Sequence, residues 1–376
     1  MIGIPGYQIV EVIHESVDVS IARGLREQDS LPVILKVLLR EYPTPLELAR
    51  YRHEFSLLRA LQVPCVNEAY ELVECGNTVA IAMEDCRGVP LNSVLAGQGG
   101  LSVADTLDVA IAIASGLADL HAANIIHKDI NPANILLAHG KLDDIRIIDF
   151  GIAERGEAAL TEVRADRLEG TLAYLSPEQT GRIASPLDRR TDLYAFGITL
   201  YEIASGQLPF READDLAWVH AHLAKRAVLL PELDPAIPAP LGAIAAKLMA
   251  KSVDDRYQTA AGVLADLETC RQQWRASGAI APFSLGRSDR PGQLVLPQQA
   301  FGRDRELAVL HSAFASAAKG RGTAVWIVGQ AGIGKSTLVR SLLDNPKFDN
   351  PKFDNPKFDN PKFYNPKFDN PEDDAQ

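Results

Sequence analysis

The sequence predicts an α+β protein whose main part is bilobal, with a small β-rich N-terminal lobe and a larger helical lobe. Three observations lead to this prediction. Residues 7–85 contain short runs in which apolar and polar residues alternate, interrupted by one helical stretch. From residue 102 onward, apolar residues recur at three- and four-residue intervals, as on the buried face of a helix. A Gly- and Pro-rich stretch then precedes a second unit and a repetitive tail.

The small lobe is expected to be a sheet with one helix. The alternating runs cover residues 7–13, 32–38 and 78–84, and alternation indicates strands because successive side chains of a strand point to opposite faces. The helical stretch between them covers residues 46–61. In the helical lobe the first helix is expected up to residue 122, with Ser102 as its N-cap. We therefore expect the first domain at residues 7–270.

A second unit is expected after a linker. Residues 271–297 lose hydrophobic periodicity and collect glycines and prolines, which predicts the linker. In the stretch 298–343, an apolar β-branched run at 323–328 and a helical pattern at 335–343 predict the start of an α/β unit. Since the sequence contains no further strand for it, we expect this unit to be incomplete.

The remaining residues, 344–376, form a low-complexity tail. The unit Asn-Pro-Lys-Phe-Asp occurs five times with one deviation, at Tyr364. A proline at every fifth position removes amide donors too often for a helix or a central strand, and solenoid repeats are several times longer. We therefore expect this tail to be disordered.

Composition excludes several classes of protein. Of the 376 residues, 47% are hydrophobic and 23% charged, which is typical of a globular protein. No apolar run is long enough to span a membrane and no signal peptide is present at the N-terminus, so we expect a cytoplasmic chain without a membrane partner. The net charge of −11 disfavours nucleic acid as a partner. The four cysteines show no metal-ligand spacing, which favours reduced thiols.

One pattern of polar residues indicates phosphoryl transfer. Asp129 and Asn134 lie in the stretch His-Lys-Asp-Ile-Asn-Pro-Ala-Asn, and Asp149 opens Asp-Phe-Gly 15 residues after Asn134. Phosphoryl transfer needs a carboxylate that orients the acceptor hydroxyl, together with oxygen ligands that hold Mg²⁺ against the triphosphate. Asp129 suits the first role, and Asn134 and Asp149 suit the second.

This pattern resembles the catalytic and metal-binding loops of eukaryotic-type (Hanks-type) serine/threonine protein kinases. The resemblance extends over residues 7–270. It implies that Lys36, in Val-Ile-Leu-Lys, holds the ATP phosphates and that Glu54 is its ion-pair partner. The stretch from Met83 to Cys86, including Glu84, resembles the hinge that binds adenine through its backbone.

Three further motifs support the resemblance and carry structural roles. Gly-Thr-Leu-Ala-Tyr-Leu-Ser-Pro-Glu, which ends at Glu178, is similar to the end of a kinase activation segment. Asp192 resembles the aspartate that anchors the catalytic loop from below. Arg256 resembles the late arginine that pairs with the buried glutamate, here Glu178. The resemblance implies that these residues hold the large lobe together.

The sequence departs from the family at three places. The glycine-rich phosphate loop is replaced by a glycine-free stretch at residues 13–21, which should cover ATP less tightly. Asn131 stands where a lysine usually faces the γ-phosphate. Lys128 replaces an arginine and cannot grip an activation-loop phosphate with two parallel bonds, so activation by loop phosphorylation is doubtful. We expect a slow but active kinase, and the alternative is a pseudokinase that acts as a scaffold or binding module.

A second nucleotide motif lies in the second unit. Gly-Gln-Ala-Gly-Ile-Gly-Lys-Ser matches a P-loop, in which backbone amides and a lysine bind phosphates and a serine hydroxyl binds Mg²⁺. The predicted binding residues are Gly329, Gly334, Lys335 and Ser336. Only 41 residues follow Lys335, so we expect no Walker B strand and no hydrolysis. The order of motifs resembles the N-terminal part of bacterial multi-sensor kinase/AAA-ATPase signalling proteins, truncated within the ATPase.

The sequence therefore predicts a protein serine/threonine kinase of bacterial signal transduction that uses ATP and Mg²⁺ to phosphorylate a protein. The catalytic set is Asp129, Lys36 and Glu54. A truncated, non-functional product is a further alternative. The sequence indicates neither the substrate protein, nor the activating signal, nor the oligomeric state.

Overall fold

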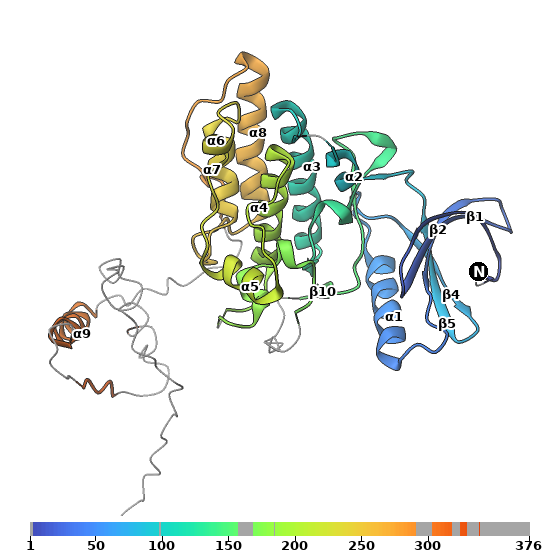
Figure 1. Ribbon diagram of the computed structural model, residues 1–376, viewed down its shortest axis with the longest axis horizontal. Helices are drawn as coiled ribbons and strands as arrows, with labels where there is room; N and C mark the ends of the chain where they lie inside the picture. The colour runs from blue at the N-terminus through green and yellow to red at the C-terminus, as the bar shows by residue number, and fades with distance from the viewer. Residues whose placement is uncertain are drawn as a thin grey trace, which may run out of the picture. The chain divides into compact units, whose positions relative to one another are not determined.

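The computed structural model describes residues 3–97, 99–156, 168–183, 185–290, 303–317, 324–328 and residue 338. It consists of two compact units, Met1–Gly292 and Gln293–Gln376. In the first unit a sheet with one helix adjoins a bundle of helices, so the predicted bilobal α+β fold is confirmed (Figure 1). Within the described residues, no helix has the length and apolar character needed to cross a membrane.

The small lobe is a five-stranded antiparallel sheet in the order β1-β2-β3-β5-β4. Its strands are β1 (Tyr7–Glu15), β2 (Val19–Arg26), β3 (Pro32–Leu38), β4 (Ala69–Cys75) and β5 (Thr78–Glu84). The single helix of this lobe, α1, spans Pro45–Ala60. Its start is fixed by a capping box in which Thr44 and Glu47 satisfy each other's backbone amides, and Pro45 fits the first turn because its missing N–H would have had no partner there.

The alternation along β3 gives the sheet two different faces. Val33, Leu35 and Val37 are buried in a small apolar core on one face. The residues between them therefore point to the opposite face, which places Lys36 on the side of α1.

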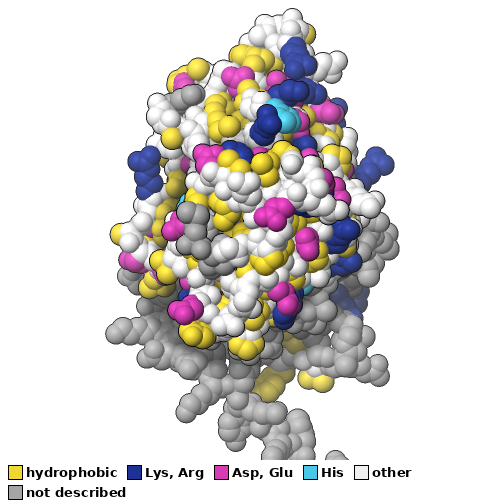
Figure 2. Space-filling model, turned by 90° about the vertical axis from the view of Figure 1, so that its right-hand side faces the viewer, with side chains coloured by type: hydrophobic (Ala, Val, Ile, Leu, Met, Phe, Trp, Pro, Cys, Tyr) yellow, Lys and Arg dark blue, Asp and Glu magenta, His cyan; other side chains and the backbone are white. Residues whose placement is uncertain are grey.

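Seen from the small-lobe side, Lys and Arg side chains are interspersed with Asp and Glu, and apolar side chains are exposed between them (Figure 2).

The helical lobe is built around α3, which packs against α4 and α8 (Figure 1). Its helices are α2 (Leu91–Leu95), α3 (Val103–Ala122), α4 (Arg189–Ser205), α5 (Asp215–Ala224), α6 (Leu230–Leu233), α7 (Ala239–Leu248) and α8 (Ala260–Ser277). Two small sheets lie beside them, β6-β8-β9 and β10-β7. Their strands are β6 (Val89–Pro90), β7 (Ile125–Ile126), β8 (Ile135–Leu137), β9 (Ile145–Ile147) and β10 (Glu154–Arg155).

The predicted linker at 271–297 differs from the structure. Helix α8 continues to Ser277, and Asp289 binds the N-terminus of this helix. The carboxylate of Asp289 accepts hydrogen bonds from the amide of Gln258 at 2.7 Å and from the amide of Thr259 at 2.9 Å. Residues 271–290 therefore belong to the helical lobe, because Asp289, inside the predicted linker, satisfies backbone amides at the start of α8.

The second unit is described only in part. Helix α9 spans Asp304–Ala317, and residues 324–328 have no regular secondary structure, although the sequence predicts a strand at 323–328. A strand needs a hydrogen-bonded neighbour, and none lies beside these residues in the part of the chain that the structure describes. Gly329, Gly334, Lys335, Ser336 and the repeat tail lie outside the described residues.

Candidate active site

The candidate site lies between the two lobes and centres on Lys36. Its Nζ donates to Glu54 at 2.7 and 2.9 Å and to Asp149 at 2.9 Å. The three residues come from β3, from α1 and from the start of the Asp-Phe-Gly motif, so the contacts join the sheet to the helical lobe. The structure thus brings together side chains as far as 113 positions apart in the sequence.

The charges of this cluster interact strongly because the side chains of Lys36 and Glu54 are largely buried. The side chains of Lys36 and Glu54 are 12% and 3% exposed, whereas that of Asp149 is 50% exposed. Burial alone would lower the pKa of Lys36, but Glu54 and Asp149 outweigh it and the pKa is raised. Lys36 in turn holds the pKa of Asp149 below its ordinary value. The cluster therefore keeps its ammonium and its accessible carboxylate charged.

Asp129 and Asn134 form the second half of the site. The Asn134 amide nitrogen donates to both the backbone oxygen and the Oδ2 of Asp129, each at 2.9 Å. Oδ1 of Asp129 accepts from the backbone amide of Thr171 at 2.8 Å. Because its amide nitrogen is used in this way, Asn134 has its amide oxygen to offer to a cation.

Asn131 organises the turn between these two residues. Its side-chain oxygen accepts from the amides of Ala133 and Asn134 at 2.9 and 3.3 Å and so caps a short 3₁₀ helix, Pro132–Asn134. Its nitrogen donates to the Thr171 hydroxyl at 3.2 Å. Asn131, which stands where the family usually carries a lysine, thus links the loop of Asp129 to Thr171 through a neutral side chain.

The loop that leads to Asp129 is held by Asp192, which is fully buried at the start of α4. Its two oxygens accept from the amides of His127 at 3.0 Å and Lys128 at 2.7 Å. Burial alone would raise the pKa of Asp192, but His121 outweighs it and the pKa is lowered. Lys128 has a φ of +69°, a conformation that costs energy for a non-glycine residue, and the bonds to Asp192 stabilise it.

The predicted hinge residues lie where β5 leads into the helical lobe. Met83 and Glu84 pair with Ile34 and Val33 of β3, and Cys86 follows as a buried thiol. Its sulfur accepts from the Asn67 side chain at 3.6 Å.

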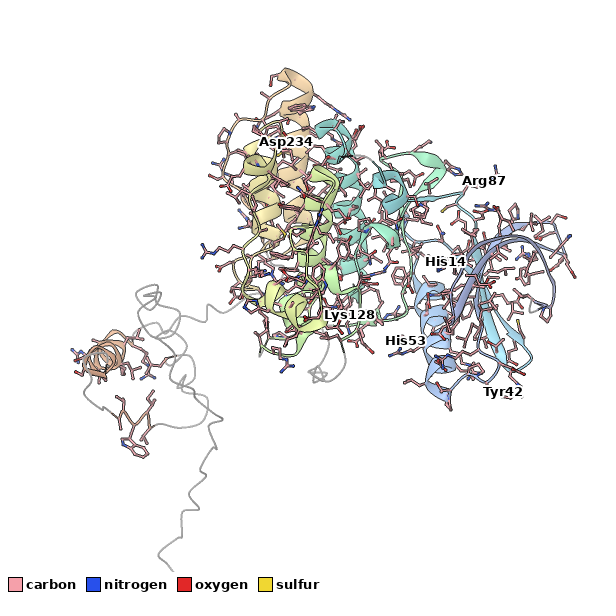
Figure 3. The ribbon with its side chains drawn as sticks, in the orientation of Figure 1. His14, Tyr42, His53, Arg87, Lys128 and Asp234 are labelled. Atoms are coloured by element: carbon pink, nitrogen blue, oxygen red, sulfur yellow. The ribbon has the colours of Figure 1, made fainter. Side chains whose placement is uncertain are left out.

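The glycine-free stretch forms a tight hairpin between β1 and β2. The amide of Ser16 donates to the Val19 oxygen at 2.9 Å, and the Val19 amide donates to the Ser16 hydroxyl at 3.1 Å. Strand register pairs His14 with Ile21 and Ile21 with Lys36. Paired residues of antiparallel strands share a face, so His14 lies on the face of Lys36, on the side toward the helical lobe (Figure 3). The glycine-free stretch thus places a side chain on the face of the sheet that carries Lys36.

The oxygen ligands at the site suit a metal only together with a nucleotide. Among the described residues, no group of three or more His, Cys, Asp or Glu could hold a metal ion alone. Mg²⁺, however, is commonly bound by one or two protein oxygens together with substrate phosphates and waters. Asn134 and the half-exposed Asp149 supply such oxygens, so the residues fit Mg²⁺ in the presence of a nucleotide.

Comparison with known proteins decides the family. The family model described as protein kinase domain matches residues 16–265. The chain belongs to the protein kinase family. A second match, to the AAA ATPase domain, covers residues 299–353 and supports the P-loop segment.

Several bacterial relatives of the kinase are named serine/threonine-protein kinases. PrkC of Bacillus subtilis is 31% identical over 239 residues, 63% of this chain and 36% of that protein. PknB of Mycolicibacterium smegmatis is 28% identical over 330 residues, 86% of this chain and 51% of that protein. Hybrid signal transduction histidine kinase G of Dictyostelium discoideum is 32% identical over 189 residues, 45% of this chain and 6% of that protein. The kinase thus spans about a third to a half of the first two relatives.

Some contacts at the site were not predicted from the sequence. Arg50 of α1 binds Glu169 at 2.7 Å, and Lys128 binds Glu154 at 2.6 Å. The spacing of Arg50 and Glu54, one helical turn apart, was the only available signal, and it does not identify the partner of Arg50.

Proposed function

We propose that this kinase transfers the γ-phosphoryl group of ATP to serine or threonine hydroxyls of a protein in bacterial signal transduction. The observation that carries the proposal is the Lys36 cluster, in which one ammonium meets a buried and an accessible carboxylate. Asp129 and Asn134 are hydrogen-bonded to each other, so the residue proposed to orient the acceptor and one of the residues proposed to bind the metal lie side by side on one loop. The bacterial relatives named serine/threonine-protein kinases support the choice of hydroxyl.

Each residue has a distinct task in this proposal. Glu54 holds the Lys36 ammonium toward the α- and β-phosphates, and Asp129 accepts the proton of the attacking hydroxyl as the new P–O bond forms and ADP leaves. Asn134 and Asp149 would hold Mg²⁺, which offsets negative charge on the phosphate oxygens. Backbone groups of Met83, Glu84 and Cys86 would bind the adenine. Because ATP is an intracellular metabolite, we place this activity in the cytoplasm.

Mass spectrometry of the purified protein after incubation with MgATP and a generic protein substrate tests the proposal. We expect phosphate on serine or threonine for the wild type and a loss of incorporation for Lys36→Met. Lys225→Met, which removes an exposed lysine paired with Glu212, should retain wild-type incorporation. Magnesium-dependent ATP binding without any phosphotransfer would instead support the scaffold alternative.

The P-loop of the second unit remains a separate prediction. The AAA ATPase match supports the motif, and we propose that Gly329, Gly334, Lys335 and Ser336 contribute at most nucleotide binding. In a Lys36→Met background, ATP binding that is lost on Lys335→Ala would assign the residual binding to this motif.

A further inference from the structure

Helix α1 carries two charged side chains that reach different halves of the candidate site. Glu54 binds Lys36, and Arg50, one turn earlier, binds Glu169 at 2.7 Å. Residues four apart on a helix lie on the same side of it. A movement of α1 that breaks one of these contacts therefore displaces the other.

Glu169 lies close in sequence to a residue that holds Asp129. Two positions later, the Thr171 amide donates to Asp129 at 2.8 Å, and the Thr171 hydroxyl accepts from Asn131 at 3.2 Å. The pair of Arg50 and Glu169 thus links the helix that orients Lys36 to the segment that orients Asp129.

A second ion pair lies next to Asp129. The ammonium of Lys128, directly before Asp129, lies 2.6 Å from Glu154 and is 7% exposed. The neighbouring backbone oxygen of Ala153 lies 3.3 Å from Nε2 of His53 on α1. Figure 3 shows His53 and Lys128 near this junction of α1 with the helical lobe. Both cations, Arg50 and Lys128, are therefore already paired with carboxylates of the chain itself.

We propose that Arg50 and Glu169 are positioning residues that hold α1 where Glu54 binds Lys36. Together with the pair of Lys128 and Glu154, they make this position of α1 independent of phosphorylation. Arg50 and Glu169 pair with each other and are distinct from the cluster of Lys36, Glu54 and Asp149. The consequence for phosphotransfer rests on the proposed function, whereas the consequence for α1 does not.

Because the pair of Arg50 and Glu169 is exposed, its effect on the position of α1 can be distinguished from an effect on global stability. Arg50 and Glu169 are 38% and 43% exposed, and ion pairs this exposed contribute little to global stability. A charge reversal should therefore leave the melting temperature nearly unchanged. It should nevertheless move α1, because Glu169 would repel a negative residue at position 50.

The experiment compares Arg50→Glu, Glu169→Arg and the double variant by hydrogen exchange of the α1 amides and by phosphotransfer kinetics with saturating MgATP. We expect each single variant to exchange its α1 amides faster and to lose about tenfold in kcat, a usual size for coupling between sites. The double variant should recover both properties. Arg52→Glu is the matched control, since Arg52 lies on the same helix and pairs with the exposed Glu74 at 3.8 Å.

A phosphatase arm tests independence from phosphate. Thr161 is the only hydroxyl-bearing residue between positions 157 and 167. Protein dephosphorylated to its unmodified mass, and Thr161→Val, should both keep wild-type α1 exchange and kcat. Loss of either property in these samples would overturn the proposal, as would single variants that exchange like the wild type or a double variant that fails to recover. An inactive wild type that still shows the expected exchange pattern would refute the proposed function and leave the positioning pair standing.

Discussion

Asp129 is fixed by donors from two separate parts of the chain. The Thr171 amide and the Asn134 side chain each bind one of its oxygens, at 2.8 and 2.9 Å. Both donors restrict the rotation of the carboxylate, as the proposed role of orienting an acceptor hydroxyl requires. Asn131, through the Thr171 hydroxyl, keeps the same geometry without adding a positive charge near the transferring group.

Replacement of Asp129 by Asn tests this role. The variant keeps the shape of the side chain but removes the group that we propose accepts the proton, so we expect kcat to fall by about 10²- to 10⁴-fold. Binding of MgATP should remain close to that of the wild type, since Asp129 is not part of the Lys36 cluster. Rapid-quench phosphotransfer and nucleotide titration measure the two effects.

The matched control is Asp143→Asn, which changes an exposed aspartate in the same lobe. It should leave kcat unaltered. Phosphotransfer by Asp129→Asn at the wild-type rate would show that another group orients the acceptor.

Single residues differ in how far the sequence predicts them. The resemblance implied that Lys36 pairs with Glu54, and the structure shows this ion pair. Asp149 was predicted as a metal ligand, and its bond to Lys36 was not predicted. Glu169 and Glu154 were not predicted as partners of Arg50 and Lys128. Carboxylates are common, and which one reaches a given cation depends on the path of the intervening backbone.

At the scale of elements, a buried ion pair joins the segment after Thr171 to the turn between α7 and α8. Arg256 donates to both oxygens of Glu178 at 2.7 and 2.8 Å, and the two side chains are 0% and 1% exposed. Thr191 of α4 adds a third bond to Glu178 at 3.0 Å. Three separate elements therefore meet at one carboxylate.

Removal of that carboxylate should be costly. Glu178→Ala leaves the Arg256 guanidinium buried without its counter-ion, and such a change lowers the free energy of unfolding by about 3–5 kcal/mol. Urea denaturation followed by circular dichroism measures the loss. Glu74→Ala removes one partner of an exposed pair and should leave the midpoint near that of the wild type. A midpoint for Glu178→Ala equal to that of Glu74→Ala would contradict the assigned role of the pair.

Elements were predicted best where local chemistry sets their ends. Helices α1 and α3 begin within a residue of their predicted starts because Thr44 and Ser102 cap them locally. The expected linker was wrong for residues 271–290, since Asp289 stabilises a helix about 30 residues earlier, a contact that local composition does not reveal. The strand expected at 323–328 needs a neighbouring strand, which its own sequence cannot supply.

At the scale of the whole molecule, a buried polar chain connects α5, α4 and the residue next to Thr171. Nε2 of His222 donates to the Leu172 oxygen at 2.8 Å, and its Nδ1 lies 3.1 Å from the Tyr194 hydroxyl. Lys251 donates to the same hydroxyl at 3.0 Å. Burial, together with the positive charge of Lys251, lowers the pKa of His222 to about 4, although the Leu172 bond and Glu212 oppose the shift. The fold therefore holds this imidazole neutral.

A neutral buried histidine makes the stability of the fold depend on pH. In the unfolded chain His222 titrates near its ordinary pKa of about 6.5, so between pH 6.5 and 4 the unfolded state binds more protons than the folded state. The free energy of unfolding must then fall as pH falls through this window, by about 2 kcal/mol from this residue between pH 7 and pH 5. His222→Gln keeps a donor for the Leu172 oxygen but cannot titrate. Between pH 7 and pH 5, its free energy of unfolding in urea titrations should therefore fall by about 2 kcal/mol less than that of the wild type. Parallel curves for the two proteins would mean that His222 has the same pKa in the folded and the unfolded chain, and that the fold does not hold this imidazole neutral.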